Sequence, residues 1–433
     1  MDNLKNIANL IMDEAKKYGV EYASCAVSLK KTKEFNVEVG EFTLLRTLFD
    51  ESVGITIYKD KKHGLASVNS LEMDNVLQAF KDACIAAESS DPDEAWEIDK
   101  SGNKMTFTDG PLECDTDKLF MRSKELLDDI NQRYPKLLVE NLISDHSVID
   151  SIYMNTYGNE YESHRGYYGF YVGYAGHEGE QSSHSYGSAA NLHDLDTPFI
   201  ELNIIDKELA DTEKQAVTVA LEDKFTGTVI FTPDCAADVI FGTIMANFVS
   251  DSGLIDDTSI WKDKLGEKVA DPRIGFKLAP HDSRIINGQN FTGEGYLTED
   301  YDVIEDGILK SFCLSQYGAN KTGRKRSPNT SSAIICKAGE KSLEDIIKSV
   351  EKGIIIGRFS GGRPGANGEF SGIAKNAFLI ENGEVTKALS ETMISDNLPE
   401  MLFRLRDVSL DVKENGMGSV PYYAFDGITI SGK

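Results

Sequence analysis

The chain has 433 residues, of which 40% are hydrophobic, so it is long enough for two packed domains and too apolar for general disorder. Its 71 acidic residues outnumber its 45 basic residues and give a net charge of -26. Such a charge repels nucleic acid and anionic membranes, which argues against both as partners. The one basic cluster, residues 321–326, is too short to form a DNA-binding groove.

The cysteine pattern and the N-terminus indicate a cytoplasmic protein. Six cysteines are scattered without a C-x-x-C pair, which is typical of a reduced protein and not of a disulfide scaffold or a zinc ribbon. Residues 1–19 carry acids within their apolar stripe and lack a small-residue cleavage site, so they do not resemble a signal peptide. No apolar run approaches the length of a membrane span.

The first half of the chain predicts an α+β domain in which helices cover one face of an antiparallel sheet. Apolar residues at helical spacing predict helices at 2–18, 73–88, 117–134 and 207–221. Alternating residues predict strands at 22–29, 34–39, 43–49, 52–59 and 62–68, with further strands between 137 and 205. A tight turn at Gly40 predicts a hairpin, and residues 91–115 predict an extended loop.

The second half is mostly β, and we place the domain boundary near residue 222, giving domains 1–222 and 223–433. Asp-Gly and Asn-Gly pairs lie between apolar strands at 301–309 and 378–385, and such pairs tolerate the positive φ of type I′ hairpin turns. A helix is expected at 342–353 with Ser342 as its N-cap, and a last strand at 427–431.

Residues 227–251 combine a short strand with the start of a helix. Thr232 is a candidate N-cap, Pro233 suits the first helical position and Asp234 favours the first turn. Phe241, Ile244 and Phe248 recur at spacings of three and four, so we expect them to form a packed apolar face.

This helix start resembles that of the TldD/PmbA family, also called the modulator of DNA gyrase family. The resemblance covers most of the chain and includes Gly293-Glu294-Gly295, the hairpin at 305–309 and the glycine-rich block at 360–384. In TldD-type members the helix carries His-Glu-x-x-x-His, which supplies metal ligands and a catalytic carboxylate. By ungapped alignment the matching residues here are Phe241, Gly242 and Ala246, and none can bind a metal or move a proton.

The resemblance implies a C-terminal domain of curved antiparallel sheets and a dimer that encloses a cavity. It also implies a role in cytosolic proteolysis or maturation of peptides. TldD-type members add a cysteine near the C-terminus, whereas the counterpart here, residues 415–419, contains none. The chain therefore resembles the metal-free, PmbA-type (TldE-like) subunit. We expect no catalytic residue and no cofactor, an extended peptide as substrate, and a TldD-type metallopeptidase subunit or a second copy as partner.

The histidines offer no convincing alternative metal site, since a metallopeptidase needs about three protein ligands, an open position and a general base. His281 is the only histidine after residue 193 and is expected in a solvated loop. His177-Glu178 and His184 are seven residues apart, which on one strand puts the histidines on opposite faces. His164 and His193 flank them in the same Ser- and Gly-rich stretch.

A glycine pair offers a candidate peptide-binding segment. Gly361 and Gly362 would let a peptide backbone approach, with Arg363 and Asn367 beside it to contact a carboxylate or a carbonyl. The alternative is a tight connection between two strands. This block is not a Walker loop, because the Gly-Lys-Ser/Thr ending is absent.

Two other functions stay open at this point. The chain could be a stand-alone binding protein for unfolded peptides or for a protein partner such as a toxin, an antitoxin or gyrase, which a genome without a TldD-type gene would favour. It could also be a hydrolase with an unrecognised site between His164 and His193, which bound metal in the isolated chain would favour.

Overall fold

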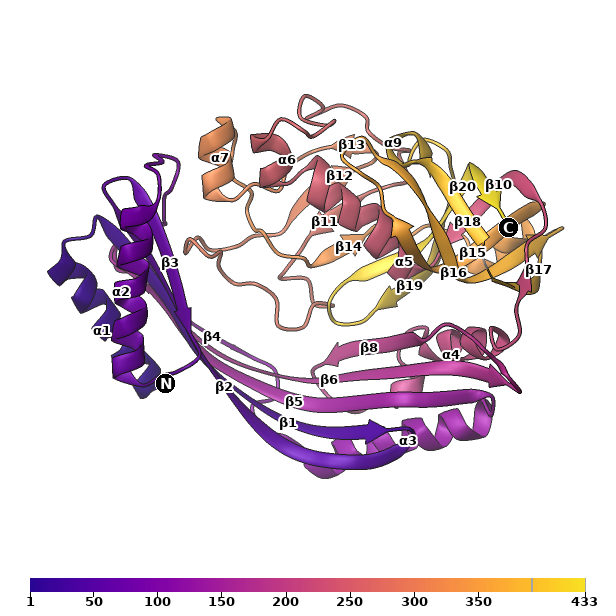
Figure 1. Ribbon diagram of the computed structural model, residues 1–433, viewed down its shortest axis with the longest axis horizontal. Coiled ribbons are helices and arrows are strands. Elements are labelled where there is room, and N and C mark those ends of the chain that lie inside the picture. The colour runs from indigo at the N-terminus through magenta and orange to yellow at the C-terminus, as the bar shows by residue number, and fades with distance from the viewer. Residues whose placement is uncertain (391, 433) are drawn as a thin grey trace.

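The computed structural model describes residues 1–390 and 392–432. A long curved sheet built by the first half of the chain wraps around a β-rich second half, which lies on its concave side (Figure 1). The strands of the first sheet are β1 (Tyr22–Glu38), β2 (Glu41–Lys59), β3 (Lys62–Val68), β4 (Lys104–Asp109), β5 (Leu137–Asn155), β6 (Glu160–Glu178), β7 (Gln181–Ser182) and β8 (Tyr186–Leu192).

The first sheet confirms the expected antiparallel meander, with strands that are longer than predicted. Strands β3, β2, β1, β5 and β6 lie side by side in that order, and β4 and β8 pair with different parts of β6. The predicted strands 22–29 and 34–39 are one strand, β1, because the polar residues between them alternate across the sheet without breaking the ladder to β5. The hairpin at Gly40 is confirmed, with φ of 79°.

Two segments of the first half differ from the prediction. The expected loop at 91–115 contains β4, which pairs with β6 in parallel and is mostly exposed. Its alternation is limited to Met105 and Phe107 within an Asp- and Gly-rich stretch, which is too short to predict a strand. The helix expected at 207–221 is α4 (Ile205–Lys214), which ends earlier because the chain then forms β9 (Val219–Ala220) beside a strand of the second half.

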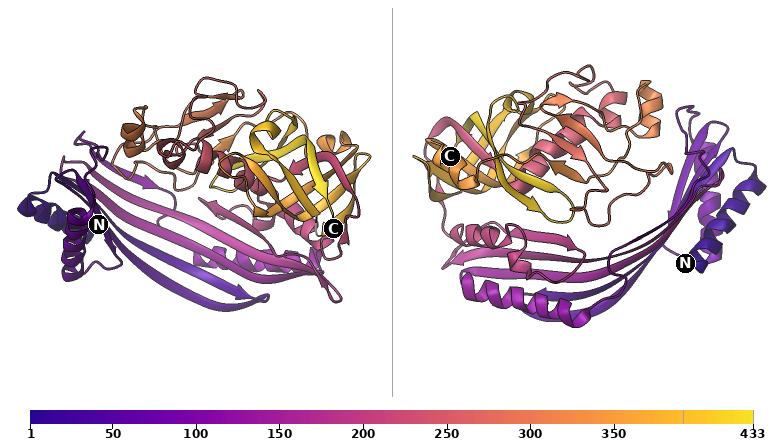
Figure 2. Two further views of the ribbon diagram at one scale, coloured as in Figure 1. Left: turned by 45° about the horizontal axis from the view of Figure 1, so that its top comes forward. Right: turned by 180° about the vertical axis from the view of Figure 1, so that it is seen from behind.

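Helices cover the convex face of the first sheet. Helices α1 (Asp2–Tyr18) and α2 (Met73–Ser89) pack on one end, and α3 (Thr116–Arg133) packs near the other (Figure 2). The apolar stripe of α1 is buried against the sheet, as its spacing predicts. Within the described residues, no helix is long and apolar enough to cross a membrane.

The second half is a β-rich body whose central strands close on themselves. Strand β10 pairs with β15 and β20, β16 pairs with β15 and β18, and β18 pairs with β20. Closure removes free edges among these strands and encloses an apolar interior. The strands are β10 (Lys224–Phe231), β11 (Phe276–Leu278), β12 (Tyr301–Glu305), β13 (Ile308–Leu309), β14 (Ile334–Cys336), β15 (Lys352–Gly362), β16 (Glu369–Glu381), β17 (Glu384–Ser390), β18 (Thr392–Asn397), β19 (Leu405–Glu414) and β20 (Ser419–Ser431).

Short helices and turns complete the second half. Both predicted hairpins are confirmed as β12–β13 and β16–β17, with positive φ at Asp306 and Asn382. The helix expected at 342–353 is shorter, and Ser342 caps it by accepting a hydrogen bond from the Asp345 amide. The helical segments are η1 (Phe199–Glu201), α5 (Pro233–Cys235), η2 (Ala236–Phe241), η3 (Ile244–Phe248), α6 (Asp251–Ile255), α7 (Gln316–Thr322), α8 (Leu343–Lys348) and α9 (Leu398–Met401).

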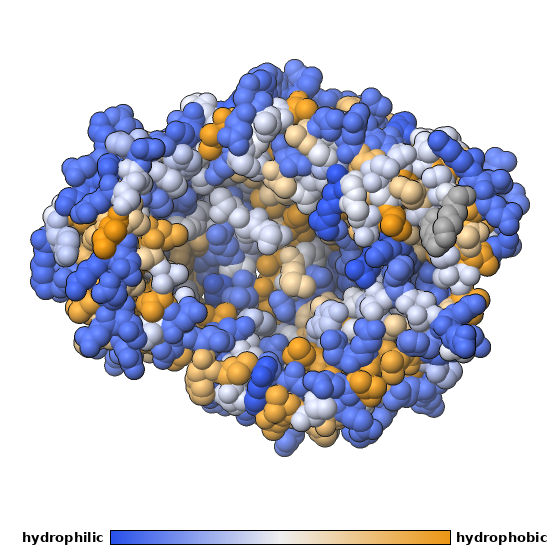
Figure 3. Space-filling model, in the orientation of Figure 1, coloured by the Kyte–Doolittle hydropathy of each residue, from blue (hydrophilic) through white to orange (hydrophobic). Residues whose placement is uncertain are grey.

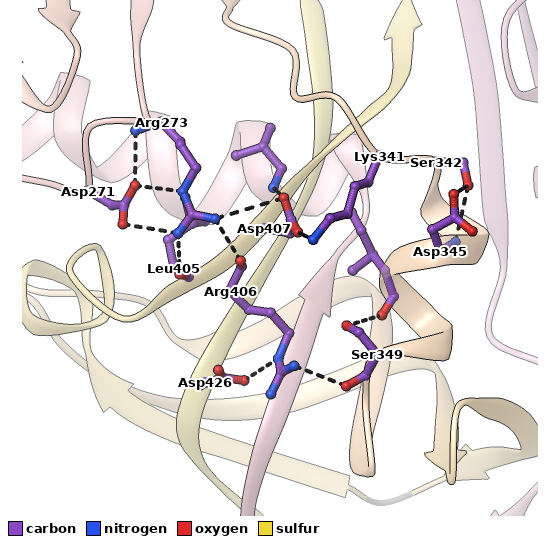
Figure 4. A network of polar contacts seen from close by, with 12 residues as sticks. Asp271, Arg273, Lys341, Ser342, Asp345, Ser349, Leu405, Arg406, Asp407 and Asp426 are labelled. Atoms are coloured by element: carbon purple, nitrogen blue, oxygen red, sulfur yellow. Dashed lines mark hydrogen bonds and ion pairs between the residues drawn. The ribbon is translucent and has the colours of Figure 1, made fainter.

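A polar network holds β19 in place. Arg273 pairs with Asp271 at 2.9 Å and donates to the backbone carbonyls of Leu405 and Arg406, while Lys341 donates to the buried Asp407 (Figure 4). Charge-assisted hydrogen bonds of this kind fix a strand more firmly than neutral ones. The network therefore anchors the start of β19 to the segments that precede β11 and α8.

Candidate functional site

A groove lies where the first sheet meets the second half of the chain. It has a volume of about 630 Å³, and strand β8 forms one wall while α5, η2, β15 and the end of β19 form the other. Figure 3 shows the molecule hollowed between these two parts. We call it the β8 groove. Its lining includes Ser185, Tyr186, Gly187, Ala189, Asp234, Asp238, Arg358, Arg363, Lys413, Asn415 and Met417.

The wall of the β8 groove contains a buried cluster of charges. The Lys413 ammonium lies 2.6 Å from a Glu208 carboxylate oxygen and 2.7 Å from Asp234 Oδ2. The side chains of Lys413 and Glu208 are only 5% and 6% exposed. Tyr186 donates to Asp234 and Ser188 donates to Glu208. The cluster thus joins α4 and β8 of the first half to α5 and β19 of the second.

Burial and neighbouring charges shift the pKa values of Glu208 and Lys413 in opposite directions. Burial raises the pKa of Glu208 to about 7, although the Lys413 ammonium favours the charged form. For Lys413, burial favours the neutral amine, but the two carboxylates outweigh it and hold its pKa above the ordinary value. We therefore treat Lys413 as a charged group that positions Asp234, not as a base or a nucleophile.

Glu208 makes the stability of the protein depend on pH. Its pKa is higher in the folded chain than in the unfolded chain, so its contribution is fully present below about pH 4.5 and is lost as the pH rises through 7. We expect the free energy of unfolding to fall by roughly 1 to 3 kcal/mol from this group between pH 5 and pH 8. Glu208→Gln should flatten this part of the urea-denaturation profile. An unchanged slope would contradict the assignment.

The helix that follows Thr232 is the segment expected to match the motif-bearing helix of TldD-type proteins. The chain begins it as predicted at Pro233 and continues it as the π-helical segments η2 and η3. Thr232 precedes the helix, but its hydroxyl donates to the Gly357 carbonyl and caps nothing, contrary to the expected N-cap bond. Phe241 is fully buried, with its ring 5.1 Å from that of Phe276 and 5.4 Å from that of Tyr423.

The residues at the motif positions do not fit a metal. Phe241 points into the core, Gly242 is half-buried without a side chain, and Ala246 is exposed, so no donor atoms converge. Among the described residues, no group of three or more His, Cys, Asp or Glu side chains is placed to hold a metal ion. In the segment expected to be the C-terminal counterpart, Asn415 and Met417 line the β8 groove.

Of the candidate peptide-binding residues, Arg363 alone lines the β8 groove, where its guanidinium lies 2.8 Å from Asp238 Oδ2. Gly361 and Gly362 are the last residues of β15 and pair with Gly372 and Ser371 of β16, and the connection between the two strands follows at residues 363–368. Asn367 lies in the following turn and accepts a hydrogen bond from a backbone amide. Their contact with a peptide stays a prediction.

The histidines between 164 and 193 do not gather into a site. His164 pairs with Asp150 at 2.8 Å, and His177 lies at the end of β6. His184 lies beyond β7, so the two histidines do not lie on one strand, contrary to the prediction. His281 contacts Thr298 through its Nε2 atom, 2.9 Å from the hydroxyl.

Strand β8 presents a backbone edge to the groove. In the described part of the chain β8 pairs with β6 alone, and Asn191 instead donates its amide to the Asn415 carbonyl across the groove. Arg358 donates to the Ser185 carbonyl on the same edge. Because backbone groups alternate along a strand, Gly187 and Ala189 also direct their N–H and C=O groups into the groove. The backbone edge at Gly187 and Ala189 therefore lies between Ser185, which is bound by Arg358, and Asn191, which is bound to Asn415.

Comparisons with known proteins agree with this architecture. Residues 225–432 match the family described as PmbA/TldA metallopeptidase C-terminal domain. The chain is 25% identical to "Metalloprotease PmbA" of Escherichia coli O157:H7 over 93% of its length and 92% of that protein. It is 23% identical to "Metalloprotease PmbA homolog" of Haemophilus influenzae, over 99% and 96%.

A solved structure matches the whole fold. The crystal structure of TldE from Thermococcus kodakarensis superposes with a TM-score of 0.85, covers 98% of this chain and 100% of that chain, and is 23% identical. That likeness shows the shared fold of both halves. The matched C-terminal domain and the relatives named PmbA, which align with nearly the whole chain, support assignment of the chain to the PmbA/TldD family.

Proposed function

We propose that this protein is a metal-free subunit of a TldD/PmbA-type metallopeptidase that acts on peptides in the cytosol. The observation that carries the proposal is Phe241, a fully buried aromatic residue at a position where TldD-type members bind a metal. A side chain packed between Phe276 and Tyr423 stabilises the core and leaves no coordination position. Hydrolysis then belongs to a TldD-type partner, and this chain contributes cavity and peptide binding.

The β8 groove supplies a surface for an extended peptide. Its wall offers outward N–H and C=O groups at Gly187 and Ala189, and an added strand makes main-chain hydrogen bonds that do not depend on peptide sequence. Arg363 and Asp238 provide charge at the opposite wall. The same groove would serve a stand-alone peptide-binding protein, so peptide binding by the isolated chain is shared by both functions.

Replacing Ala189 with proline tests the β8 edge. Proline removes the N–H that faces the groove and leaves the β6 ladder intact, since only alternate residues bond to β6. We expect affinity for a fluorescein-labelled unstructured peptide to fall three- to tenfold, about the effect of one hydrogen bond. Fluorescence anisotropy measures this, and Ala189→Ser, which keeps the N–H, is the matched control. Equal affinity of the proline and serine variants would refute the edge as the binding surface.

Zinc titration of the purified chain tests the metal-free assignment. Calorimetry or native mass spectrometry should show no stoichiometric zinc, because the motif positions offer no donors. One tightly bound zinc per chain would overturn the proposal and favour a hydrolytic site elsewhere, with His164 to His193 the first region to mutate.

A further inference from the structure

A second hollow lies beyond the far end of β8. It has a volume of about 580 Å³ and lies between β4 and β6 of the first sheet and the loop that follows β11. We call it the Arg165 hollow; its charged and imidazole groups are Asp109, Arg165, His193, His281 and Asp282. His193 follows β8 directly, so the hollow and the β8 groove are successive sites along one strand.

Arg165 has no ion pair with a carboxylate among the described residues, although the chain is strongly acidic. Its guanidinium donates from Nη1 to the Gly288 carbonyl, and Asp109 lies opposite it on β4. Burial lowers the pKa of Arg165, whereas the nearby Asp109 charge opposes that shift. A half-buried guanidinium that retains unused donors is suited to a bidentate contact with a planar anion.

Of the two carboxylates that line the hollow, Asp282 is paired with cations and Asp109 is near an imidazole. Asp282 accepts hydrogen bonds from Arg284 at 2.8 Å and from Lys277 at 3.1 Å. Asp109 lies 3.9 Å from His193 Nδ1. His281 contacts Thr298 through Nε2, which leaves Nδ1 as its remaining polar atom. Arg165 is therefore the cation of the hollow that no described carboxylate contacts directly; Asp109 is its cross-strand neighbour and two imidazoles lie beside it.

We propose that the Arg165 hollow binds a carboxylate of an extended peptide, held by the guanidinium of Arg165 with His193 and His281 as further hydrogen-bonding groups. The peptide as the source of that carboxylate rests on the proposed function; the carboxylate chemistry rests on the hollow alone. At about 3.3 Å per residue, four residues separate Ala189 from His193 by about 13 Å. A peptide along the β8 edge thus reaches the hollow within a few residues, either with its C-terminal carboxylate or with an Asp or Glu side chain.

Three labelled peptides of one uncharged sequence test the proposal with the full chain: a C-terminal acid, its amide, and the amide with one added Asp. We expect the acid, the Asp-containing amide or both to bind at least tenfold more tightly than the plain amide, and the tighter one identifies the source. Arg165→Met should remove the difference, whereas the exposed Arg133→Met should retain it. Equal binding of all three peptides to the unmodified chain would overturn the carboxylate site while leaving peptide binding in place.

Two further measurements show whether a negative result comes from the carboxylate site, from misfolding of the Arg165→Met variant or from a wrong proposed function. His193→Gln keeps Arg165 and its bond to Gly288, and it should weaken binding of the tighter peptide without changing binding of the plain amide. If no peptide binds, the proposed function fails, and saturation-transfer NMR with N-acetylglycine then tests the hollow directly. A signal lost in Arg165→Met supports the carboxylate site, and the same signal in both proteins refutes it.

Discussion

Replacing Lys413 with methionine is expected to destabilise the protein by about 3 to 5 kcal/mol, since it leaves the buried Glu208 carboxylate and the partly exposed Asp234 carboxylate without their cation. Urea denaturation followed by fluorescence measures the loss. The effect should be smaller at pH 5.5 than at pH 8, because Glu208 can take up a proton as the pH falls below 7. Hydrogen exchange at β8 should also increase, because the cluster ties β8 to β19.

A control variant and a double variant test the reason given for the effect of Lys413→Met. Lys387→Met changes an exposed lysine on β17 and should leave the denaturation curve unchanged. Lys413→Met combined with Glu208→Gln should recover part of the lost stability, because one of the two unpaired charges is removed. A single Lys413→Met variant as stable as the unmodified chain would show that the cluster does not hold the two halves together.

Replacing Phe241 with alanine is expected to cost about 3 to 5 kcal/mol, the usual effect of deleting a fully buried aromatic ring. The residue packs within the apolar core of the second half. Trp261 lies in that core beside Phe248, so its fluorescence reports unfolding there, and Trp96→Phe removes the only other tryptophan. Phe403→Ala, which changes an exposed ring in the same half, should cost about 0.5 kcal/mol or less.

A second substitution of Phe241 tests whether this helix has only a structural role or retains part of a metal-binding site. Phe241→His restores the first residue of the motif, yet it puts an imidazole between Phe276 and Tyr423, where burial of a polar ring without a partner is costly. We expect this variant to lose stability and to gain no zinc. A variant that folds normally and binds zinc would mean that the helix retains a metal-binding face.

Local chemistry made part of the fold predictable from the sequence. The turns at Asp306-Gly307 and Asn382-Gly383 were correctly predicted, because these pairs adopt the positive φ that hairpin turns require. The first helix was predicted to its last residue, since an unbroken apolar stripe ends at Gly19. The same reasoning missed β4, whose alternation is limited to Met105 and Phe107, and divided β1, whose polar centre resembles a break.

The charged cluster of the site could not be predicted in this way. Glu208, Asp234 and Lys413 are up to 205 positions apart, and only the packing of β19 against α4 brings them together. A lysine at an inward strand position was a signal, but nothing local identified its partners. The β8 edge was hidden for a similar reason, because a free edge depends on which strands pair. The residues at the motif positions could be judged from the sequence, because residue type alone shows that Phe241, Gly242 and Ala246 have no side-chain donor atom for a metal.

Reconstitution with a TldD-type metallopeptidase subunit tests the metal-free subunit role most directly. Peptidase activity on an unstructured peptide is measured for this chain alone, for the partner alone and for an equimolar mixture, with the metal content of each subunit determined. We expect no activity from this chain, metal only in the partner, and activity in the mixture above that of the partner alone. Metal and peptidase activity in the isolated chain, or a mixture no more active than the partner, would contradict this role.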